Sequence, residues 1–199
     1  MVGRIKEMNK QLEDKVQLVL ANEEDLALFQ KELQEAFINA LIENLGDAEA
    51  GPIPSDEDIQ QSFHAPEAVI YHILLNGKKV GGVVLKIDNK THRNWVDLLY
   101  ISSKTHNRGI GSAAWQAIEA QYPETKVWEL FTPYFEKRNI HFYVNKCGFH
   151  IVEFYNKFNP DPHQPRVNEH QNNSRPLEEY EFFRFEKVMK MKTRKKIEN

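Results

Sequence analysis

The sequence predicts a mixed α/β fold, and three observations carry this prediction. The chain has 199 residues, 41% of them hydrophobic, and no long linker divides it, which is typical of one domain with a sizeable core. The dipeptide Asn76-Gly77 stands between two apolar, β-prone segments and is a strong hairpin signal. Further along, the glycine-rich run 106–111 separates a β-prone segment from a helical one, as expected where a strand leads into a helix.

The first half of the chain predicts a strand, two helices and three more strands. Residues 16–21 form the first strand, and Asn22 or the acids after it begin a helix that runs to about Leu45. Ser55 caps a second, short helix that ends near His64. Strands are then predicted at 68–75, 80–87 and 95–101. The apolar residues that recur at helical spacing in the first helix, with acids between them, are Leu26, Phe29, Leu33, Phe37 and Leu41.

The second half predicts a helix, a strand, a helix and two strands. The helix covers 112–122 and the strand covers 126–131. The next helix opens near Pro133 and ends at Gly148, where Cys147 is expected to be a small buried residue. A strand begins after Phe149, and the last strand covers 178–190.

We therefore expect one domain over 15–190, with an N-terminal extension at 1–14 and a basic tail at 191–199. The polar segment 156–176 contains four prolines, and a loop of this length inside a compact domain is either disordered or functional. Its position favours a lid or a contact in a homodimer over a linker.

Charge and composition exclude several classes of partner. The net charge is −3, and residues 22–58 hold eleven acidic side chains against Lys31 as the one base, which does not fit a nucleic-acid surface. No apolar run is long enough to span a membrane, and a single cysteine indicates a reducing compartment, so we expect a cytoplasmic protein without a membrane partner. The eight histidines show no metal-ligand spacing, and we predict no metal.

The run from His106 to Ser112 predicts a phosphate site. A glycine-rich turn before a helix brings the backbone close to a ligand and points several unpaired N–H groups, with the positive end of the helix dipole, at one place. The run lacks the Lys-Ser/Thr pair of a Walker loop and the third glycine of a dinucleotide motif. An ordinary tight strand-to-helix connection also explains the run when it is taken alone.

Together with the segment His141 to Phe149, the turn resembles the GCN5-related N-acetyltransferase (GNAT) family. The shared pattern is a strand, a turn of the form Gln/Arg-x-x-Gly-x-Gly/Ala, a helix, a strand, and a helix ending in Phe-Tyr-x-x-x-Gly-Phe. It covers about residues 93–155, and the order of the other elements extends it over most of the chain. The resemblance implies a GNAT-like α/β fold, with a mixed, mostly antiparallel central sheet and helices on both faces, and acetyl-CoA as co-substrate.

The resemblance also implies which residues hold acetyl-CoA. Its pyrophosphate would lie on the amides of the turn, and its pantetheine beside the preceding strand, where Leu99 and Ile101 offer backbone groups. Asn139, on one helical face with Tyr143, either hydrogen-bonds the cofactor or faces solvent; other relatives place an asparagine one turn earlier, where this chain has Glu136. The residues implied for the turn are His106, in place of the usual Gln or Arg, and Asn107, Arg108, Gly109, Ile110, Gly111, Ser112 and Ala113.

Acetyl transfer needs an oxyanion donor, a proton donor for the leaving thiolate and a route for the proton of the amine. The family pattern implies the backbone N–H of Leu99 and the hydroxyl of Tyr143 for the first two, while packing against the sheet is the structural alternative for Tyr143. Candidate bases are Asp97, which shares a strand face with Leu99 by alternation, and Glu129 in the middle of the next strand. For both carboxylates a salt bridge to a neighbouring strand is the alternative, and water serves as the base in many relatives.

From the resemblance we expect direct transfer of acetyl from acetyl-CoA to a primary amine in a ternary complex. The alternative is a non-catalytic CoA-binding or protein-interaction module on the same fold. The acidic segment 22–58 is the solvated face of a helix, a negative border that attracts a cationic amine, or both. That amine would belong to a small molecule or to a protein.

Overall fold

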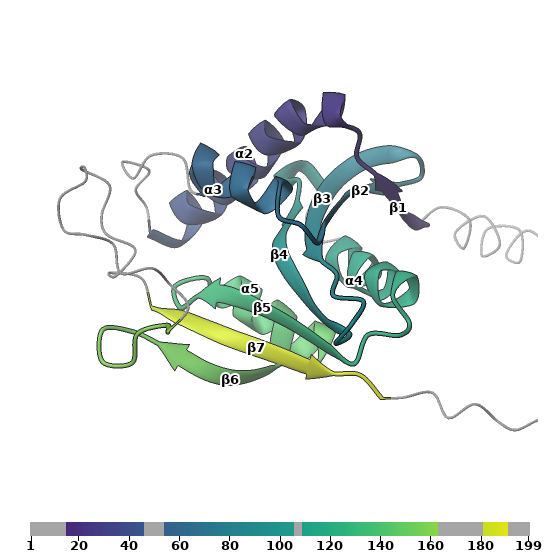
Figure 1. Ribbon diagram of the computed structural model, residues 1–199. Coiled ribbons are helices and arrows are strands. Elements are labelled where there is room, and N and C mark those ends of the chain that lie inside the picture. The colour runs from purple at the N-terminus through teal and green to yellow at the C-terminus, as the bar shows by residue number, and fades with distance from the viewer. Residues whose placement is uncertain (1–14, 46–53, 106–108, 163–180, 191–199) are drawn as a thin grey trace, which may run out of the picture.

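The computed structural model describes residues 15–45, 54–105, 109–162 and 181–190 (Figure 1). In these residues seven strands form one sheet in the order β1-β2-β3-β4-β5-β7-β6. All neighbouring strands are antiparallel except β4 and β5, which are parallel. The mixed, mostly antiparallel sheet predicted from the sequence is confirmed. The predicted N-terminal extension, the basic tail and residues 163–176 of the long loop lie outside the described residues.

The elements lie close to their predicted positions. The first half of the chain forms β1 (Val16–Leu20), η1 (Glu23–Asp25), α2 (Leu26–Leu45), α3 (Asp56–Phe63), β2 (Ala68–Leu75), β3 (Lys78–Lys86) and β4 (Arg93–Ile101). The second half forms η2 (Ser103–Thr105), α4 (Ile110–Gln121), β5 (Val127–Pro133), α5 (Lys137–Phe142), η3 (Tyr143–Cys147), β6 (His150–Tyr155) and β7 (Phe182–Val188). None of the described helices is long and apolar enough to cross a membrane.

Local signals explain where several elements begin and end. Asn76 and Gly77 have positive φ angles of 52° and 77°, as a two-residue type I′ turn between β2 and β3 requires. The hydroxyl of Ser55 accepts a hydrogen bond of 3.2 Å from the N–H of Asp58, and the Asp58 carboxylate accepts one from the N–H of Ser55. This capping box starts α3.

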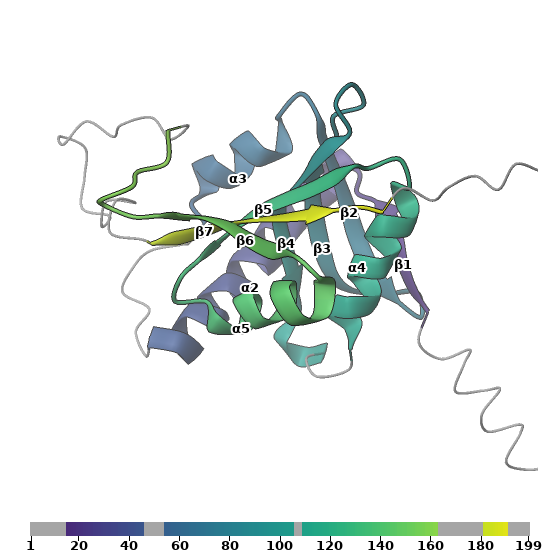
Figure 2. The same ribbon diagram turned by 90° about the horizontal axis from the view of Figure 1, so that it is seen from below.

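Helices cover both faces of the sheet (Figure 2). The neighbouring residues Val83 and Val84 of β3 belong to different core clusters, because successive side chains of a strand point to opposite faces. The cluster under α2 and α3 consists of Phe29, Leu33, Ile59, Phe63, Val84 and Tyr100. The cluster under α4 and η3 is larger, and its bulkiest fully buried members are Trp115, Trp128, Phe149 and Phe185.

A β-bulge in β4 changes the faces predicted for this strand. Val84 pairs with Leu98 and Leu85 pairs with Val96, so Asp97 is the additional residue without a partner in β3. Leu99 therefore shares a face with Val96, and both pack into the larger core cluster. The expectation that Asp97 shares a face with Leu99 assumed unbroken alternation, and it is wrong because the bulge adds one residue.

The strands β4 and β5 separate along their length. Their ladder joins Arg93–Trp95 to Val127–Glu129 and stops there. Beyond Trp95, β4 continues beside β3, whereas β5 continues beside β7, and Figure 1 shows the two strands diverging. Among the described residues, the edge of β4 that faces β5 therefore has no strand partner at Leu99 and is open there.

Candidate functional site

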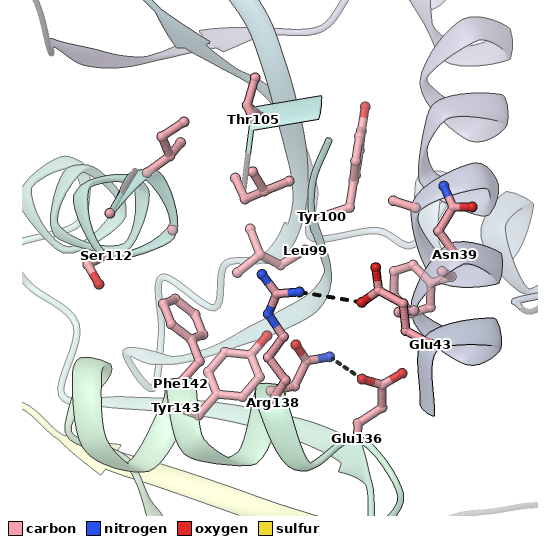
Figure 3. A pocket seen from close by; sticks show the side chains of 18 residues that line it. Asn39, Glu43, Leu99, Tyr100, Thr105, Ser112, Glu136, Arg138, Phe142 and Tyr143 are labelled. Atoms are coloured by element: carbon pink, nitrogen blue, oxygen red, sulfur yellow. Dashed lines mark hydrogen bonds and ion pairs between the residues drawn. The ribbon is translucent and has the colours of Figure 1, made fainter. Parts of the chain in front are cut away.

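A pocket of about 270 Å³ lies where β4 has left β5. It is surrounded by α2, the end of β4, the start of α4 and the segment formed by α5 and η3 (Figure 3). The structure thus brings the glycine turn and the second motif, which are far apart in the sequence, to one place. The predicted site residues that line the pocket are Leu99, Ile101, Gly109, Ile110, Gly111, Ser112, Asn139 and Tyr143.

The glycine turn forms one wall of the pocket. Gly109 is the N-cap of α4 and has a φ of 71°, a conformation that is costly for a residue with a Cβ. The N–H of Ala113 donates to the carbonyl of Gly109 at 3.1 Å and closes the first helical turn. The N–H groups of the three residues between them have no partner within the helix, as at any helix start. Ala113 itself is not among the lining residues. Outside the described residues lie His106, Asn107 and Arg108.

Tyr143 stands on the other side of the pocket, and its hydroxyl points into it (Figure 3). Its ring packs against Phe149 and Phe185, with centroids 5.8 and 6.0 Å away. Burial raises the pKa of the phenol above its usual value of 10.0, with further effects from Cys147 and Glu136. Tyr143 therefore packs against the core and also presents a neutral hydroxyl, a proton donor, to the pocket.

Tyr143 begins a π turn, which explains a difference from the family pattern. That pattern has three residues between the tyrosine and the glycine, whereas four separate Tyr143 from Gly148 here. The carbonyl of Tyr143 accepts a hydrogen bond from the N–H of Gly148 and another, of 3.0 Å, from that of Phe149. A π turn accommodates one additional residue in a helix and often occurs at functional sites.

The wall formed by α2 carries a charge that the site prediction did not name. Glu43 lines the pocket near the end of α2, and its Oε2 lies 3.6 Å from Nη1 of Arg138 on α5. Both side chains are more than half exposed, at 61% and 53%. The acidic composition of segment 22–58 was the signal for this wall. The remaining α2 residues of the wall are Ala36, Phe37, Asn39 and Ala40.

Glu136 is a second carboxyl in the pocket, and it is buried, with 7% of its surface exposed. Nδ2 of Asn139 donates a hydrogen bond of 3.2 Å to Oε2 of Glu136. Burial raises the pKa of Glu136; the nearby guanidinium of Arg138 opposes this rise and the carboxylate of Glu43 adds to it. The available sequence signal was its position, because relatives place an asparagine there.

The two predicted bases are not among the lining residues of the pocket. Asp97 forms an ion pair of 2.9 Å with Lys86 on β3. Glu129, 4% exposed, forms ion pairs of 2.6 Å with Arg93 and 3.1 Å with Arg184. For both carboxylates the structure shows the salt bridge to a neighbouring strand that was the alternative.

Two other reactive side chains, those of Cys147 and His150, are not among the residues that line the pocket. Cys147 is buried, and burial raises the pKa of its thiol to about 12, so the thiolate nucleophile is absent at neutral pH. The side chain of His150 is exposed. Among the described residues, no group of three or more His, Cys, Asp or Glu side chains is placed to hold a metal ion.

A sequence model of the acetyltransferase (GNAT) family matches residues 27–149, a range that contains every residue lining the pocket. The chain belongs to the GNAT family. This GNAT chain is also 58% identical, over 185 residues, to "uncharacterized protein YrkN" of Bacillus subtilis (strain 168). The alignment covers 93% of this chain and 100% of that protein.

Solved structures share the GNAT fold at low sequence identity. The ribosomal-protein-S18-alanine N-acetyltransferase from Escherichia coli gives a TM-score of 0.62 at 11% identity, covering 91% of this chain and 98% of that one. A Bacillus subtilis acetyltransferase in complex with CoA gives 0.56 at 16% identity, covering 88% and 99%. The spermidine N-acetyltransferase from Vibrio cholerae, in complex with CoA and spermine, gives 0.57 at 14% identity, covering 87% and 95%.

Proposed function

We propose that this GNAT protein transfers the acetyl group of acetyl-CoA to a primary amine by direct attack in a ternary complex. The observation that carries the proposal is the position of the pocket. It lies beside the open edge of β4, between the helix start that offers free amides and the hydroxyl of Tyr143. Acetyl-CoA bound there would place its pyrophosphate at the start of α4 and its sulfur near Tyr143, on the opposite wall of the pocket.

The pocket fits acetyl-CoA on its own geometry. The start of α4 suits a pyrophosphate, because its unpaired N–H groups can donate hydrogen bonds and the positive end of the helix dipole favours an anion there. Pantetheine suits the edge of β4 beyond its ladder with β5, where it would lie beside Leu99 and Ile101 in the manner of an added strand. The CoA bound in the structures of the Bacillus subtilis and Vibrio cholerae proteins supports the same co-substrate here. We include the turn residues His106, Asn107 and Arg108 in this cofactor site.

In the reaction, the lone pair of the amine forms a bond to the acetyl carbonyl carbon, and the bond from that carbon to sulfur breaks. The backbone N–H of Leu99 would stabilise the negative charge that develops on the carbonyl oxygen. The hydroxyl of Tyr143 would give its proton to the leaving thiolate. The products are an N-acetyl amine, CoA as the free thiol and one proton released to solvent.

The acceptor we propose is cationic and enters beside the acidic segment 22–58. Glu43 of this segment lies in the pocket wall, where a negative charge raises the local concentration of an ammonium ion. The similar structures include the N-acetyltransferases of a polyamine and of a protein alanine, so both a small-molecule amine and a protein amine are candidate acceptors here.

The long loop and the location of the protein add two lesser proposals. Phe158, in the described part of loop 156–176, is 84% exposed, an apolar side chain suited to a homodimer contact. The one cysteine of the chain is a free thiol, which fits a cytoplasmic location. Sedimentation of the wild type beside Phe158→Ser would test the dimer.

The proposed activity is tested by incubating the protein with acetyl-CoA and, separately, with spermidine, n-butylamine and a peptide with an N-terminal alanine. Release of CoA thiol together with an acetylated product by mass spectrometry is the expected result. Calorimetric binding of CoA without thiol release for any of these amines would favour the non-catalytic module instead.

A further inference from the structure

Glu136 is a buried carboxyl that faces a pocket rather than a salt-bridge partner. It is 7% exposed and lies where β5 has ended and α5 begins. Among the described residues its side chain has one hydrogen-bonding partner, Asn139, which holds Oε2 at 3.2 Å. A buried carboxylate is unfavourable unless it is paired. A ligand that pairs with Glu136 would therefore be bound favourably here.

The charges around Glu136 define what that ligand must be. The groups that face it are Arg138 and Asn139 from α5, Tyr143 from η3 and Glu43 from α2. Arg138 turns to Glu43, at 3.6 Å, so its one positive charge is already shared with an exposed carboxylate. Two carboxylates against one guanidinium leave a single negative charge. One ammonium group balances it, whereas an anionic acceptor adds to the imbalance.

We propose that Glu136 binds the ammonium group of the acceptor and accepts the proton that this group must lose before attack. The inference rests on the proposed acetyltransferase function and names the base of that reaction. Asn139 is a positioning residue, since its amide fixes one oxygen of the carboxylate and leaves the other for the ammonium ion.

The proton balance of this step is complete. The ammonium ion transfers one proton to the carboxylate of Glu136 and becomes a neutral amine with a free lone pair. The amine attacks the acetyl carbonyl carbon, and the thiolate that leaves takes the proton of Tyr143. The nitrogen then loses a second proton, which restores the phenol through water, and Glu136 releases its proton to solvent. One proton is set free for each amide formed.

The environment suits this role. An alkylammonium ion holds its proton tightly, so a carboxylate of ordinary pKa is a weak base toward it. Burial raises the pKa of the Glu136 carboxyl and so brings it closer to the pKa of the ammonium ion. Glu136 and Tyr143 line the same pocket, so the proposed proton acceptor and the proposed proton donor are available at one site.

The test compares Glu136→Gln with Glu43→Gln, which removes a carboxylate from the same pocket but keeps the proposed base. With spermidine, n-butylamine or the alanine peptide as acceptor, we expect Glu136→Gln to lower kcat by about 100-fold or more. Calorimetry should show unchanged CoA affinity. The acid limb of the pH profile of kcat/KM should vanish in Glu136→Gln. It should persist in Glu43→Gln, at a lower pH, because the Glu43 carboxylate raises the pKa of Glu136.

Asn139→Ala provides an independent test of the proposal if Glu136→Gln does not fold. The amide of Asn139 stabilises the ionised carboxylate, so its loss should move the acid limb to higher pH. A wild-type acid limb in Asn139→Ala, or a kcat and acid limb in folded Glu136→Gln equal to those of the wild type, would overturn the assignment of Glu136. Failure of the wild type itself to release CoA with any amine would instead count against the proposed function.

Discussion

Gly111 and Phe142 meet across the pocket: a Cβ placed on Gly111 would lie 3.1 Å from Cε2 and 3.2 Å from Cζ of Phe142. The glycine belongs to the turn at the start of α4, and the phenylalanine belongs to the end of α5. The two motifs on either side of the proposed cofactor site therefore approach each other closely, and a side chain at position 111 would disturb both.

Gly111→Glu should abolish CoA binding. The new side chain would enter the space of the pyrophosphate, add a negative charge beside it and displace the ring of Phe142. Calorimetry with CoA measures the effect, and circular dichroism checks that the variant is folded. A folded Gly111→Glu protein with wild-type affinity would remove the glycine turn from the cofactor site.

Gly109→Ala should weaken both stability and CoA binding, whereas Gly77→Ala should weaken stability alone. Both glycines have positive φ, 71° and 77°, and neither has a neighbour within 4 Å of an added Cβ. Each substitution should therefore cost about 1–2 kcal/mol of unfolding free energy through backbone strain. Gly77 lies in the β2–β3 hairpin, away from the pocket. Equal CoA affinities for the two variants would contradict the prediction.

Tyr143→Phe should lower kcat by about 100-fold while the CoA dissociation constant stays unchanged, because one hydroxyl is lost and the packing of the ring against Phe149 is kept. Steady-state kinetics and calorimetry give the two values. The matched control is Tyr134→Phe, at a tyrosine that is 44% exposed and outside the pocket. A similar kcat in both variants would leave Tyr143 with a packing role only.

The protein should lose stability as pH rises above about 10. Burial is the main cause that raises the pKa of Tyr100, Tyr122 and Tyr143 in the folded state. The folded chain keeps these protons where the unfolded chain loses them, so the stabilisation is full below the unfolded pKa and disappears as pH rises through the folded values. The midpoint of urea unfolding should therefore decrease as the pH is raised from about 9 to about 11. The fall should be smaller in Tyr122→Phe.

Glu129→Gln should lower stability by about 1–3 kcal/mol, because it removes a buried charge that pairs with Arg93 and Arg184 and leaves both guanidinium groups without it. Denaturant unfolding measures the loss. Glu124→Gln, at an exposed position, should change stability by less than about 0.5 kcal/mol. If the folded Glu129→Gln protein keeps its stability but loses turnover, the residue is a base after all.

The order of elements was predictable because its signals are local. The Asn76-Gly77 turn, the Ser55 cap and the apolar spacing of α2 are each contained within a few residues of the chain. The glycine turn and Tyr143 were predicted from a family pattern, and both motifs of that pattern line one pocket. These parts of the pocket therefore needed no knowledge of how distant segments pack.

The incorrect or missing site predictions concern residues whose environment depends on a single additional residue or on partners far away in the sequence. One bulged residue at Asp97 exchanges the two faces of a strand and leaves no mark in composition. Glu129 finds its partners 36 and 55 residues away, so its ion pairs could not be assigned from its neighbours in the chain. Glu136 lines a pocket together with residues of α2, which are far away in the sequence, so its burial could not be predicted from its neighbours in the chain.

The π turn of η3 has a consequence for reading relatives of this protein. Counting back from Gly148 by the family spacing arrives at Val144, so an ungapped alignment assigns the tyrosine column to a residue without a hydroxyl. Deleting one residue between Tyr143 and Gly148 would rotate the phenol by about 100° about the helix axis. If Tyr143 is the proton donor, the length of this segment matters more to the reaction than the identity of its exposed residues, Asn145 and Lys146.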